Sequence, residues 1–142
     1  AGVGADGMTV AWCDTNVILR HLTGEPPELA ARASATMAEV EAGRLRLRVA
    51  TEVVGELVYV LTGKTYQYTR QDVAKRLTAL LSIDGIEAEE PDLCLIALTR
   101  MSELDVPFVD ALLAGRALSS EEPVATFDDR DFPRLGVARL PI

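Results

Sequence analysis

The sequence predicts one α/β domain built around a mainly parallel sheet. Short apolar runs rich in β-forming residues alternate with longer amphipathic segments along the chain, and Gly or Pro stands at many of the junctions. Alternation of this kind is typical of parallel sheets, in which helices connect successive strands. The 142 residues suit one domain with a hydrophobic core, and no repeat or linker divides them. We expect this domain to span residues 8–142.

The first half of the domain is expected to contain two strands and three helices. A β-forming run begins the domain and ends at Asp14, after which apolar residues return at helical spacing. The dipeptide Thr23-Gly24 and the residue Gly43 are typical helix ends, and alternating apolar and basic residues in LRLRVA indicate a strand. In chain order the predicted elements are a strand at 10–12, helices at 17–22 and 28–42, a strand at 45–50 and a helix at 51–61.

The second half is expected to begin with a loop and to return to the alternation of helix and strand. Thr69 with Asp72 indicates a helix start, and Pro91 suits the first turn of a helix. The run 106–109 is apolar and is expected to be extended, with a helix beginning at Asp110. The remaining predictions are a helix at 73–81, a strand at 86–88, a helix at 92–104, a strand at 124–127 and an edge strand within 136–142.

The composition restricts the classes of function. A net charge of −8 argues against nucleic-acid binding through a broad basic surface, but it permits an acidic pocket neutralised by divalent cations, or a basic partner. No apolar run approaches the roughly 20 residues that span a bilayer. Residues 1–7 lack the pattern of a secretory signal, so we expect a flexible leader there. Cys13 and Cys94 are expected to be buried thiols of a cytoplasmic protein.

Four acidic residues stand at comparable places in the predicted fold. Asp14, Asp110 and Asp128 each follow an apolar strand or extended run, and Glu56 lies within an amphipathic helix. The carboxyl ends of parallel strands meet in one crevice, where several carboxylates repel one another unless a cation or a proton intervenes. Oxygen ligands favour Mg²⁺ or Mn²⁺. The alternative is structural: an acid at a helix start is commonly a cap, and a helical glutamate is commonly solvated.

Other acidic or phosphate-binding sites fit the sequence poorly. Asn16 occupies the place where a haloacid-dehalogenase-type phosphatase has its second Asp, and no lysine follows Lys75, as a response-regulator receiver would require. The single histidine, His21, excludes a zinc site with several histidines and a ribonuclease with two catalytic histidines. No P-loop, G-x-G-x-x-G or nucleophile elbow is present.

Taken together, the four acidic segments resemble a known family. DTNVILR at Asp14, ELVYVL at Glu56, PFVDALLAG at Asp110 and TFDDRDF at Asp128 are similar in order and spacing to the four acidic motifs of PIN-domain ribonucleases, and most similar to VapC-type toxins. The resemblance implies a three-layer α/β/α fold. The family usually reads T-x-D-x-D-F at the last motif, whereas this chain has one more residue between the acids. Asp128 is the preferred fourth acid, with Asp129 and Asp131 as alternatives.

The resemblance also implies an activity and partners. It implies an endoribonuclease dependent on Mg²⁺ or Mn²⁺, in which Asp14, Asp110 and Asp128 hold metal and Glu56 binds metal or orients water. Asn16 and Thr126 would hold the carboxylates in place. It further implies a homodimer, a tRNA or rRNA substrate and a cognate VapB-type antitoxin, with no membrane association. The alternatives are a PIN-like module that binds RNA or protein without cleavage, and a metal-dependent phosphatase.

Overall fold

The computed structural model describes residues 2–3 and 7–142, and its central sheet is mainly parallel as predicted. Strands β2, β3 and β4 run parallel, and β1 pairs antiparallel with β2. Strands β5 and β6 form a separate parallel pair. The bounds are β1 Gly2–Val3, β2 Thr9–Trp12, β3 Leu45–Val49, β4 Ile86–Ala88, β5 Val124–Ala125 and β6 Arg139–Leu140. The edge strand expected within 136–142 is therefore present as β6.

Helices fill the positions that the sequence predicts. The described part of the chain contains seven, and six of them match the predicted helices within a few residues. The seventh, α7, is a single turn between β5 and β6 that was not predicted. The bounds are α1 Thr15–Thr23, α2 Pro27–Glu41, α3 Thr51–Thr62, α4 Arg70–Leu81, α5 Pro91–Leu104, α6 Phe108–Ser120 and α7 Asp131–Arg134. The prediction of an α/β fold is confirmed.

Local capping explains several helix boundaries. The Asp14 carboxylate accepts a hydrogen bond from the Thr15 N–H and begins α1, and the Thr69 hydroxyl accepts one from the Asp72 N–H and begins α4. Gly24 ends α1 in the left-handed conformation, which glycine adopts without steric cost. Each of these interactions satisfies a backbone group that a helix end leaves unpaired.

The expectation of an extended run at 106–109 was wrong in its second half. Pro107 is the N-cap of α6, so Phe108 and Val109 are already helical and Asp110 lies in the first turn. Phe108 is buried, and a Cβ on Gly55 of α3 would lie 3.9 Å from its ring. The apolar run therefore reflects a helix start that packs against α3 and not a strand of the sheet.

Part of the predicted leader joins the sheet. Gly2 and Val3 pair with Val10 and Thr9 at the edge of β2. The rest of the leader, apart from Gly7, consists of residues 1 and 4–6, which lie outside the described residues.

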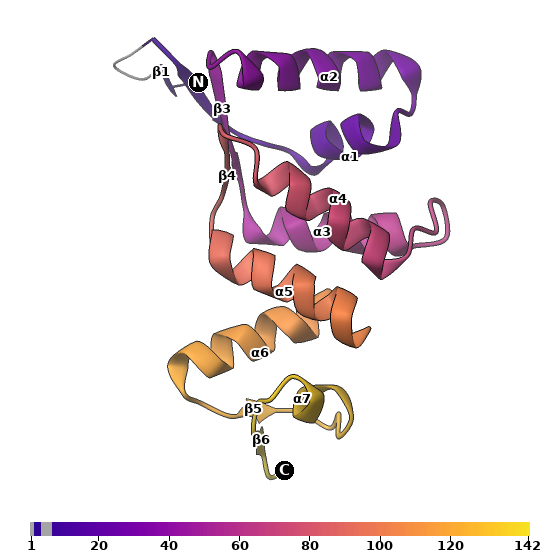
Figure 1. The fold of residues 1–142 in the computed structure, drawn as a ribbon, viewed down its shortest axis with the longest axis vertical. Helices are drawn as coiled ribbons and strands as arrows, with labels where there is room; N and C mark the ends of the chain where they lie inside the picture. Colours follow the sequence, from indigo (N-terminus) through magenta and orange to yellow (C-terminus); the bar gives the residue numbers. More distant parts are fainter. Residues whose placement is uncertain (1, 4–6) are drawn as a thin grey trace.

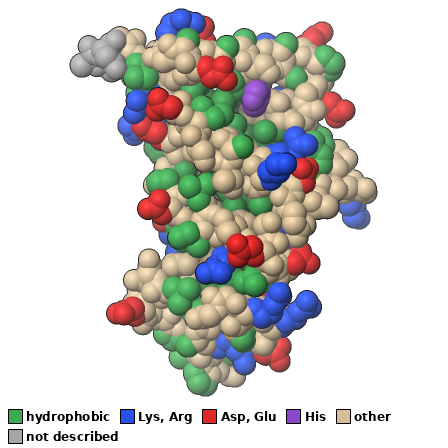
Figure 2. All heavy atoms as spheres, viewed as in Figure 1, with side chains coloured by type: hydrophobic (Ala, Val, Ile, Leu, Met, Phe, Trp, Pro, Cys, Tyr) green, Lys and Arg blue, Asp and Glu red, His purple; other side chains and the backbone are tan. Residues whose placement is uncertain are grey.

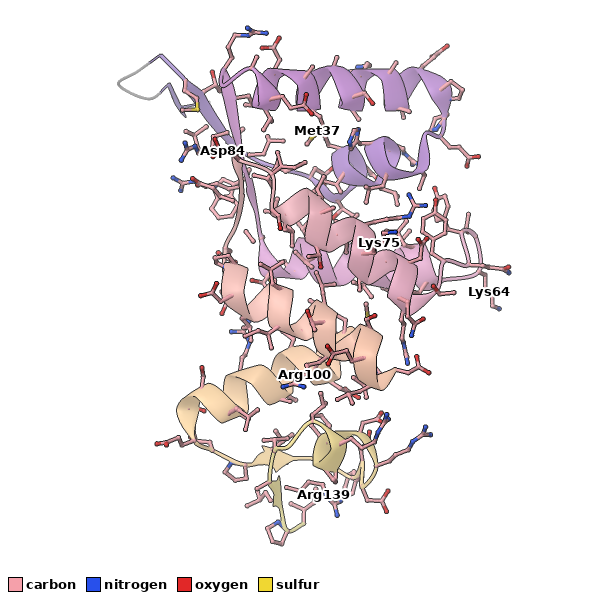
Figure 3. All side chains as sticks on the ribbon, in the orientation of Figure 1. Met37, Lys64, Lys75, Asp84, Arg100 and Arg139 are labelled. Carbon is pink, nitrogen blue, oxygen red and sulfur yellow. The ribbon has the colours of Figure 1, made fainter. Side chains whose placement is uncertain are left out.

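The two faces of the central sheet differ. Helices α1 to α4 lie on one side of it (Figure 1), and Leu47 and Val49 are buried toward them. Met37 points from α2 toward α1 (Figure 3) and is also buried. On the opposite face Trp12 and Arg48 are exposed. Helix α6, the β5–β6 pair and α7 lie at the end of the molecule away from α2 (Figure 1).

This arrangement affects the predicted crevice. Because β5 pairs with β6 and not with β2, the residues that follow β2 and β5 do not meet at one edge of a single sheet. The expectation that all the strand ends would converge is therefore not met in this structure.

The core is apolar and contains both cysteines. The largest fully buried side chains lie on α1, β3, α3, α4, α5 and in the segment before α6: Ile18, Val49, Val54, Leu57, Leu61, Val73, Leu77, Cys94, Leu98, Met101 and Val106. Cys13 and Cys94 are buried and free, as predicted, and burial together with the neighbouring Asp14 raises the pKa of Cys13 to about 11. In the described segments we find no helix with the length and apolar character that crossing a bilayer requires.

Replacement of a core leucine should be costly. Leu98 on α5 is fully buried, so Leu98→Ala is expected to lower the free energy of unfolding by about 2–5 kcal/mol, through lost burial and a residual cavity. Ile96 on the same helix is 55% exposed, and Ile96→Ala should change it by less than about 0.5 kcal/mol. Urea unfolding measures both values. Equal losses would contradict the assigned core.

Candidate metal-binding site

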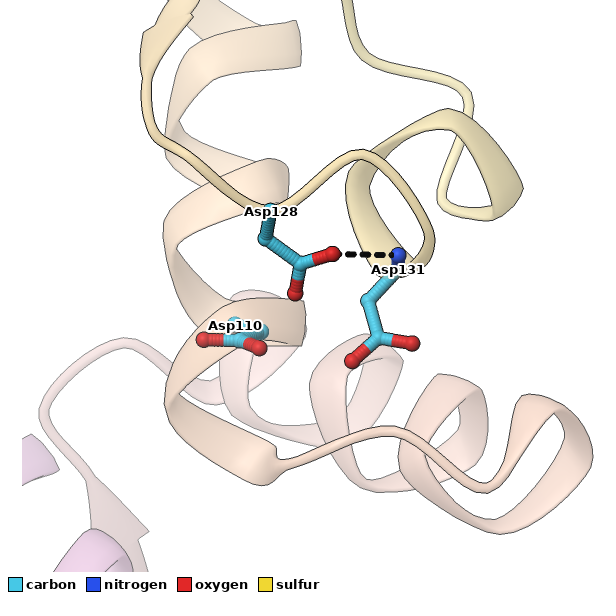
Figure 4. A group of neighbouring side chains, drawn as sticks. All are labelled: Asp110, Asp128 and Asp131. Carbon is cyan, nitrogen blue, oxygen red and sulfur yellow. Dashed lines mark hydrogen bonds between the residues drawn. The ribbon is translucent and has the colours of Figure 1, made fainter.

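Three aspartates form the acidic cluster of this structure. One carboxylate oxygen each from Asp110, Asp128 and Asp131 lies within 4.8 Å of the other two, and Figure 4 shows the three side chains facing one another. Asp110 comes from the first turn of α6, Asp128 from the loop after β5 and Asp131 from the start of α7. Two of them belong to the predicted site, and the third was an alternative for its last position.

Backbone hydrogen bonds fix Asp128. Its N–H donates to the Thr126 hydroxyl at 2.9 Å, and its Oδ1 accepts from the N–H groups of Arg130 at 2.8 Å and Asp131 at 2.9 Å. These bonds fold the loop into a tight turn of the kind that Asp side chains stabilise. The backbone donors of Asp131 and Arg130 also lower the pKa of Asp128, because they favour its charged form.

The turn explains the additional residue between the acids. With Asp128 bound to the Asp131 N–H, the two residues between them are accommodated in the loop and Asp131 reaches the cluster. Its carboxylate lies 3.6 Å from Arg134 Nη1 and 3.9 Å from Arg130 Nε. Asp129, the other alternative, is exposed and does not belong to the cluster.

Asp110 is the electrostatically strained member of the cluster. Burial raises its pKa above 3.8, and the neighbouring charges of Asp128 and Asp131 raise it further, whereas Arg70 acts in the opposite direction. Arg70 itself is hydrogen-bonded to the backbone carbonyl of Asp105 and to its carboxylate. Arg70 therefore also compensates the charge of Asp105, and the negative charge of the three-aspartate cluster remains only partly compensated.

The chemistry of the cluster fits a hard divalent cation. All three donors are carboxylate oxygens, they come close enough to share one ion, and they repel one another without it. Mg²⁺ and Mn²⁺ prefer such ligands and retain water in their remaining positions.

Asp14 and Glu56 form a second acidic pair through Thr15. The Thr15 N–H donates to Asp14 Oδ1 at 2.9 Å, and the buried Thr15 hydroxyl donates to Glu56 Oε2 at 3.0 Å. Both acids are exposed. Asp14 stands at the start of α1, and Figure 1 shows α1 and α6 apart along the long axis, with α4 and α5 between them. The four predicted acids therefore lie in two groups, with Asp14 and Glu56 in one and Asp110 and Asp128 in the other.

The supporting residues agree only partly with the sequence prediction. Thr126 holds Asp128 as expected, whereas Asn16 is exposed and lines a groove between α1 and α2. Sequence reasoning did not identify Thr15 or Arg70. The position of Thr15, directly after an acid at the end of a strand, could have indicated its role. Arg70 lies 40 residues before Asp110 in the chain, and nothing in the sequence connects the two.

Comparison with known proteins assigns the family. The PIN-domain family model matches residues 11–138, nearly the whole chain. The chain belongs to the PIN-domain family. No match was found among curated proteins. Among solved structures, the chain is similar to a chain of the VapBC2 complex from Rickettsia felis bound to a DNA fragment from their promoter. The sequence identity is 17% and the TM-score 0.37, over 94% of this chain and 98% of that chain.

Membership of the PIN-domain family confirms the resemblance seen in the acidic motifs. The match includes the segments around Asp14, Glu56, Asp110 and Asp128, and it agrees with the observed α/β architecture. Divalent-metal chemistry is typical of this family, and the Asp110–Asp128–Asp131 cluster is the place in the described residues where three acidic groups could share an ion.

Removing the charge of Asp110 should stabilise the metal-free fold. The folded-state pKa of Asp110 is raised, so its ionised form destabilises the fold at neutral pH, and Asp110→Asn removes that penalty. We expect Tm to rise by about 1–3 °C at pH 7 in EDTA. The gain should be complete above the raised pKa and vanish as the pH falls below 3.8, where Asp110 is protonated in both states.

Asp129→Asn is the matched control, because Asp129 is an exposed acid of the same loop outside the cluster. Its Tm should stay unchanged across the same pH range. A lower Tm for Asp110→Asn at pH 7 would show that the assigned repulsion does not dominate at this position.

Proposed function

We propose that this PIN domain is a metal-dependent endoribonuclease of the VapC type. It would hydrolyse phosphodiester bonds in tRNA or rRNA, inhibit translation and be neutralised by a cognate VapB-type antitoxin. The observation that carries the proposal is the Asp110–Asp128–Asp131 cluster, whose incompletely compensated charge suits a divalent cation. The similarity of the four acidic motifs to those of VapC-type toxins supports the narrower assignment.

In this proposal Asp110, Asp128 and Asp131 hold Mg²⁺ or Mn²⁺. When bound, such an ion lowers the pKa of a water molecule and offsets the negative charge of the scissile phosphate. The residues of the chain do the positioning: Thr126 and the N–H groups of Arg130 and Asp131 hold Asp128 in one orientation. Asp110 supplies a third carboxylate, and a bound cation would offset the burial and the neighbouring negative charges that raise its pKa.

Asp14 and Glu56 are proposed to serve the same reaction. Thr15 fixes both carboxylates, which is the kind of support that functional acids require. Glu56 would accept a proton from the attacking water or orient it, and Asp14 would contribute to metal binding. Because the two acidic groups are separate in this structure, a reaction that uses both requires them to approach one another.

The proposed partners follow from charge and from the family resemblance. A chain with a net charge of −8 is suited to a basic partner, as a neutralising antitoxin segment would be. A homodimer and a cytoplasmic location are part of the same proposal. A non-catalytic PIN-like module is the second candidate, and the separation of Asp14 from the three-aspartate cluster is the observation that favours it.

Cleavage of RNA should require the metal and the cluster. Purified protein free of antitoxin is incubated with total cellular RNA in Mg²⁺ or Mn²⁺, and discrete fragments are expected that disappear in EDTA. Asp110→Asn should lower the cleavage rate at least about 100-fold, because it removes a charged ligand. Asp129→Asn should cleave at the wild-type rate, since Asp129 lies outside the cluster. Asp14→Asn reports whether the second acidic group takes part.

Three outcomes would change the proposal. Fragments that persist in EDTA or in Asp110→Asn would refute the assigned metal centre. Folded, metal-loaded protein that cleaves no RNA in the total pool would favour the non-catalytic module. Wild-type cleavage by Asp14→Asn would exclude Asp14 from catalysis.

Metal binding should also be measurable without any cleavage. Titration with Mn²⁺ is expected to raise Tm at pH 7, with about 2.7 kcal/mol of stabilisation at a concentration 100 times Kd. The effect should weaken as the pH falls toward the raised pKa of Asp110, because protons then compete with the ion. Asp131→Asn should bind Mn²⁺ more weakly and Asp129→Asn should not; equal affinities would remove Asp131 from the site.

A further inference from the structure

The exposed face of the central sheet carries an unusual group of side chains. Trp12, Arg46, Arg48 and Glu87 alternate with residues that point to the core, and we call this group the aromatic–basic face. The register places Trp12 opposite Arg48 and Arg48 opposite Glu87, so these three form one row across β2, β3 and β4. Figure 2 shows charged side chains of both signs along the edge where β3 and β4 lie in Figure 1.

Trp12 is the central feature of this face. It is the only tryptophan of the chain and is 59% exposed, although large aromatic side chains are generally well buried. The Arg48 guanidinium lies 5.9 Å from the centre of its ring, in the position of a cation–π contact. The two planar groups together offer a flat surface to solvent.

The charges of the face are positive on balance. Glu87 is shared by two arginines: it accepts a hydrogen bond from Arg46 Nη1, and its other oxygen lies 4.0 Å from Arg48 Nε. One positive charge therefore remains uncompensated in a chain whose net charge is −8. The face thus has positive charge available for an anionic ligand.

These properties disfavour an apolar protein cover. An apolar helix laid on the face would have to desolvate two arginines and one glutamate, and it would bring no acid to pair the remaining positive charge. A single-stranded nucleic acid has the opposite requirements, because its bases stack on aromatic and guanidinium planes while its phosphates bind cations.

We infer that the aromatic–basic face binds single-stranded RNA, with a base stacked on Trp12 and phosphates at Arg46 and Arg48. The inference rests on the proposed function for the choice of RNA as the ligand. Trp12 is the last residue of β2, and Asp14 follows two residues later at the start of α1, so at most roughly 7 Å of chain separates them. RNA held on this face therefore runs toward the Asp14–Glu56 pair, so the face would act in substrate binding and not in the chemical step.

Intrinsic fluorescence tests this directly, because the only tryptophan is the proposed contact. The protein is titrated in EDTA, so that binding is read without cleavage, with an oligouridylate of about ten nucleotides, a length within the usual site sizes for single strands. Quenching of Trp12 is expected. A duplex of oligouridylate with oligoadenylate should quench much less, since its bases are paired and stacked.

Matched variants separate the contacts of the face from general electrostatics. Arg48→Ala should weaken binding about tenfold and reduce its dependence on salt, whereas Arg100→Ala should leave both unchanged. Arg100 lies on α5 (Figure 3), away from the central sheet. Trp12→Ala, followed by the anisotropy of a labelled oligonucleotide, should also weaken binding about tenfold. Circular dichroism shows whether each variant is folded. If Trp12→Ala is misfolded, the inference is tested with Arg48→Ala alone.

Several outcomes would overturn the inference. Absence of quenching would do so, as would equal quenching by duplex and single strand or equal effects of Arg48→Ala and Arg100→Ala. A change in Trp12 emission with protein concentration alone would show that a second copy covers the face. The nuclease proposal is judged separately: cleavage without binding at this face removes only the inference, and binding without cleavage removes only the nuclease.

Discussion

The packing of α5 against α6 determines where the metal-binding cluster lies. It is the most extensive contact between two helices of the described chain, and Gly115 lies within it: a Cβ there would lie 2.6 Å from Leu93 Cδ1, so the Leu93 side chain would have to move. Phe108 adds a contact with α3 beside Gly55. Asp110 is carried by α6, and α6 in turn packs against β5 and α7; Asp128 lies in the loop after β5, and Asp131 begins α7. The position of all three acids thus depends on how closely two helices approach.

The cluster shows how function can oppose stability. Three carboxylates of like charge are held together by the backbone, and burial makes the charge of Asp110 still less favourable. The energy that stabilises the surrounding fold comes from the apolar core, most of whose side chains lie on the helices. A cation would remove the repulsion, and this is the physical link between metal binding and the stability of this part of the molecule.

The order and type of the elements could be predicted from the sequence because their signals are local. Thr69, Gly24, Pro27 and Pro91 mark helix ends by capping or by restricted backbone geometry, and they do so wherever the helix finally packs. Asp110 and Asp128 could be assigned to the site in the same way, because an acid that directly follows an apolar run can be recognised from the sequence alone.

The rest depended on interactions between distant residues. Strand β5 has two residues, too few for a pattern that shows which strand it joins, so its pairing with β6 and the resulting separation of Asp14 from Asp128 could not be predicted. The place of Asp131 depends on a hydrogen bond to its backbone N–H. The start of α6 was predicted wrongly because a short apolar run before an acid has the same sequence pattern whether it forms a strand or the first turn of a buried helix.

The thiol next to Asp14 has a consequence for the durability of the protein. Because Cys13 is buried and burial raises its pKa to about 11, its thiol is protonated at pH 7. The thiolate is the form that oxidants and alkylating agents attack, so Cys13 should react more slowly with both than an exposed cysteine does. The Asp14–Glu56 pair therefore stands beside a thiol of low reactivity.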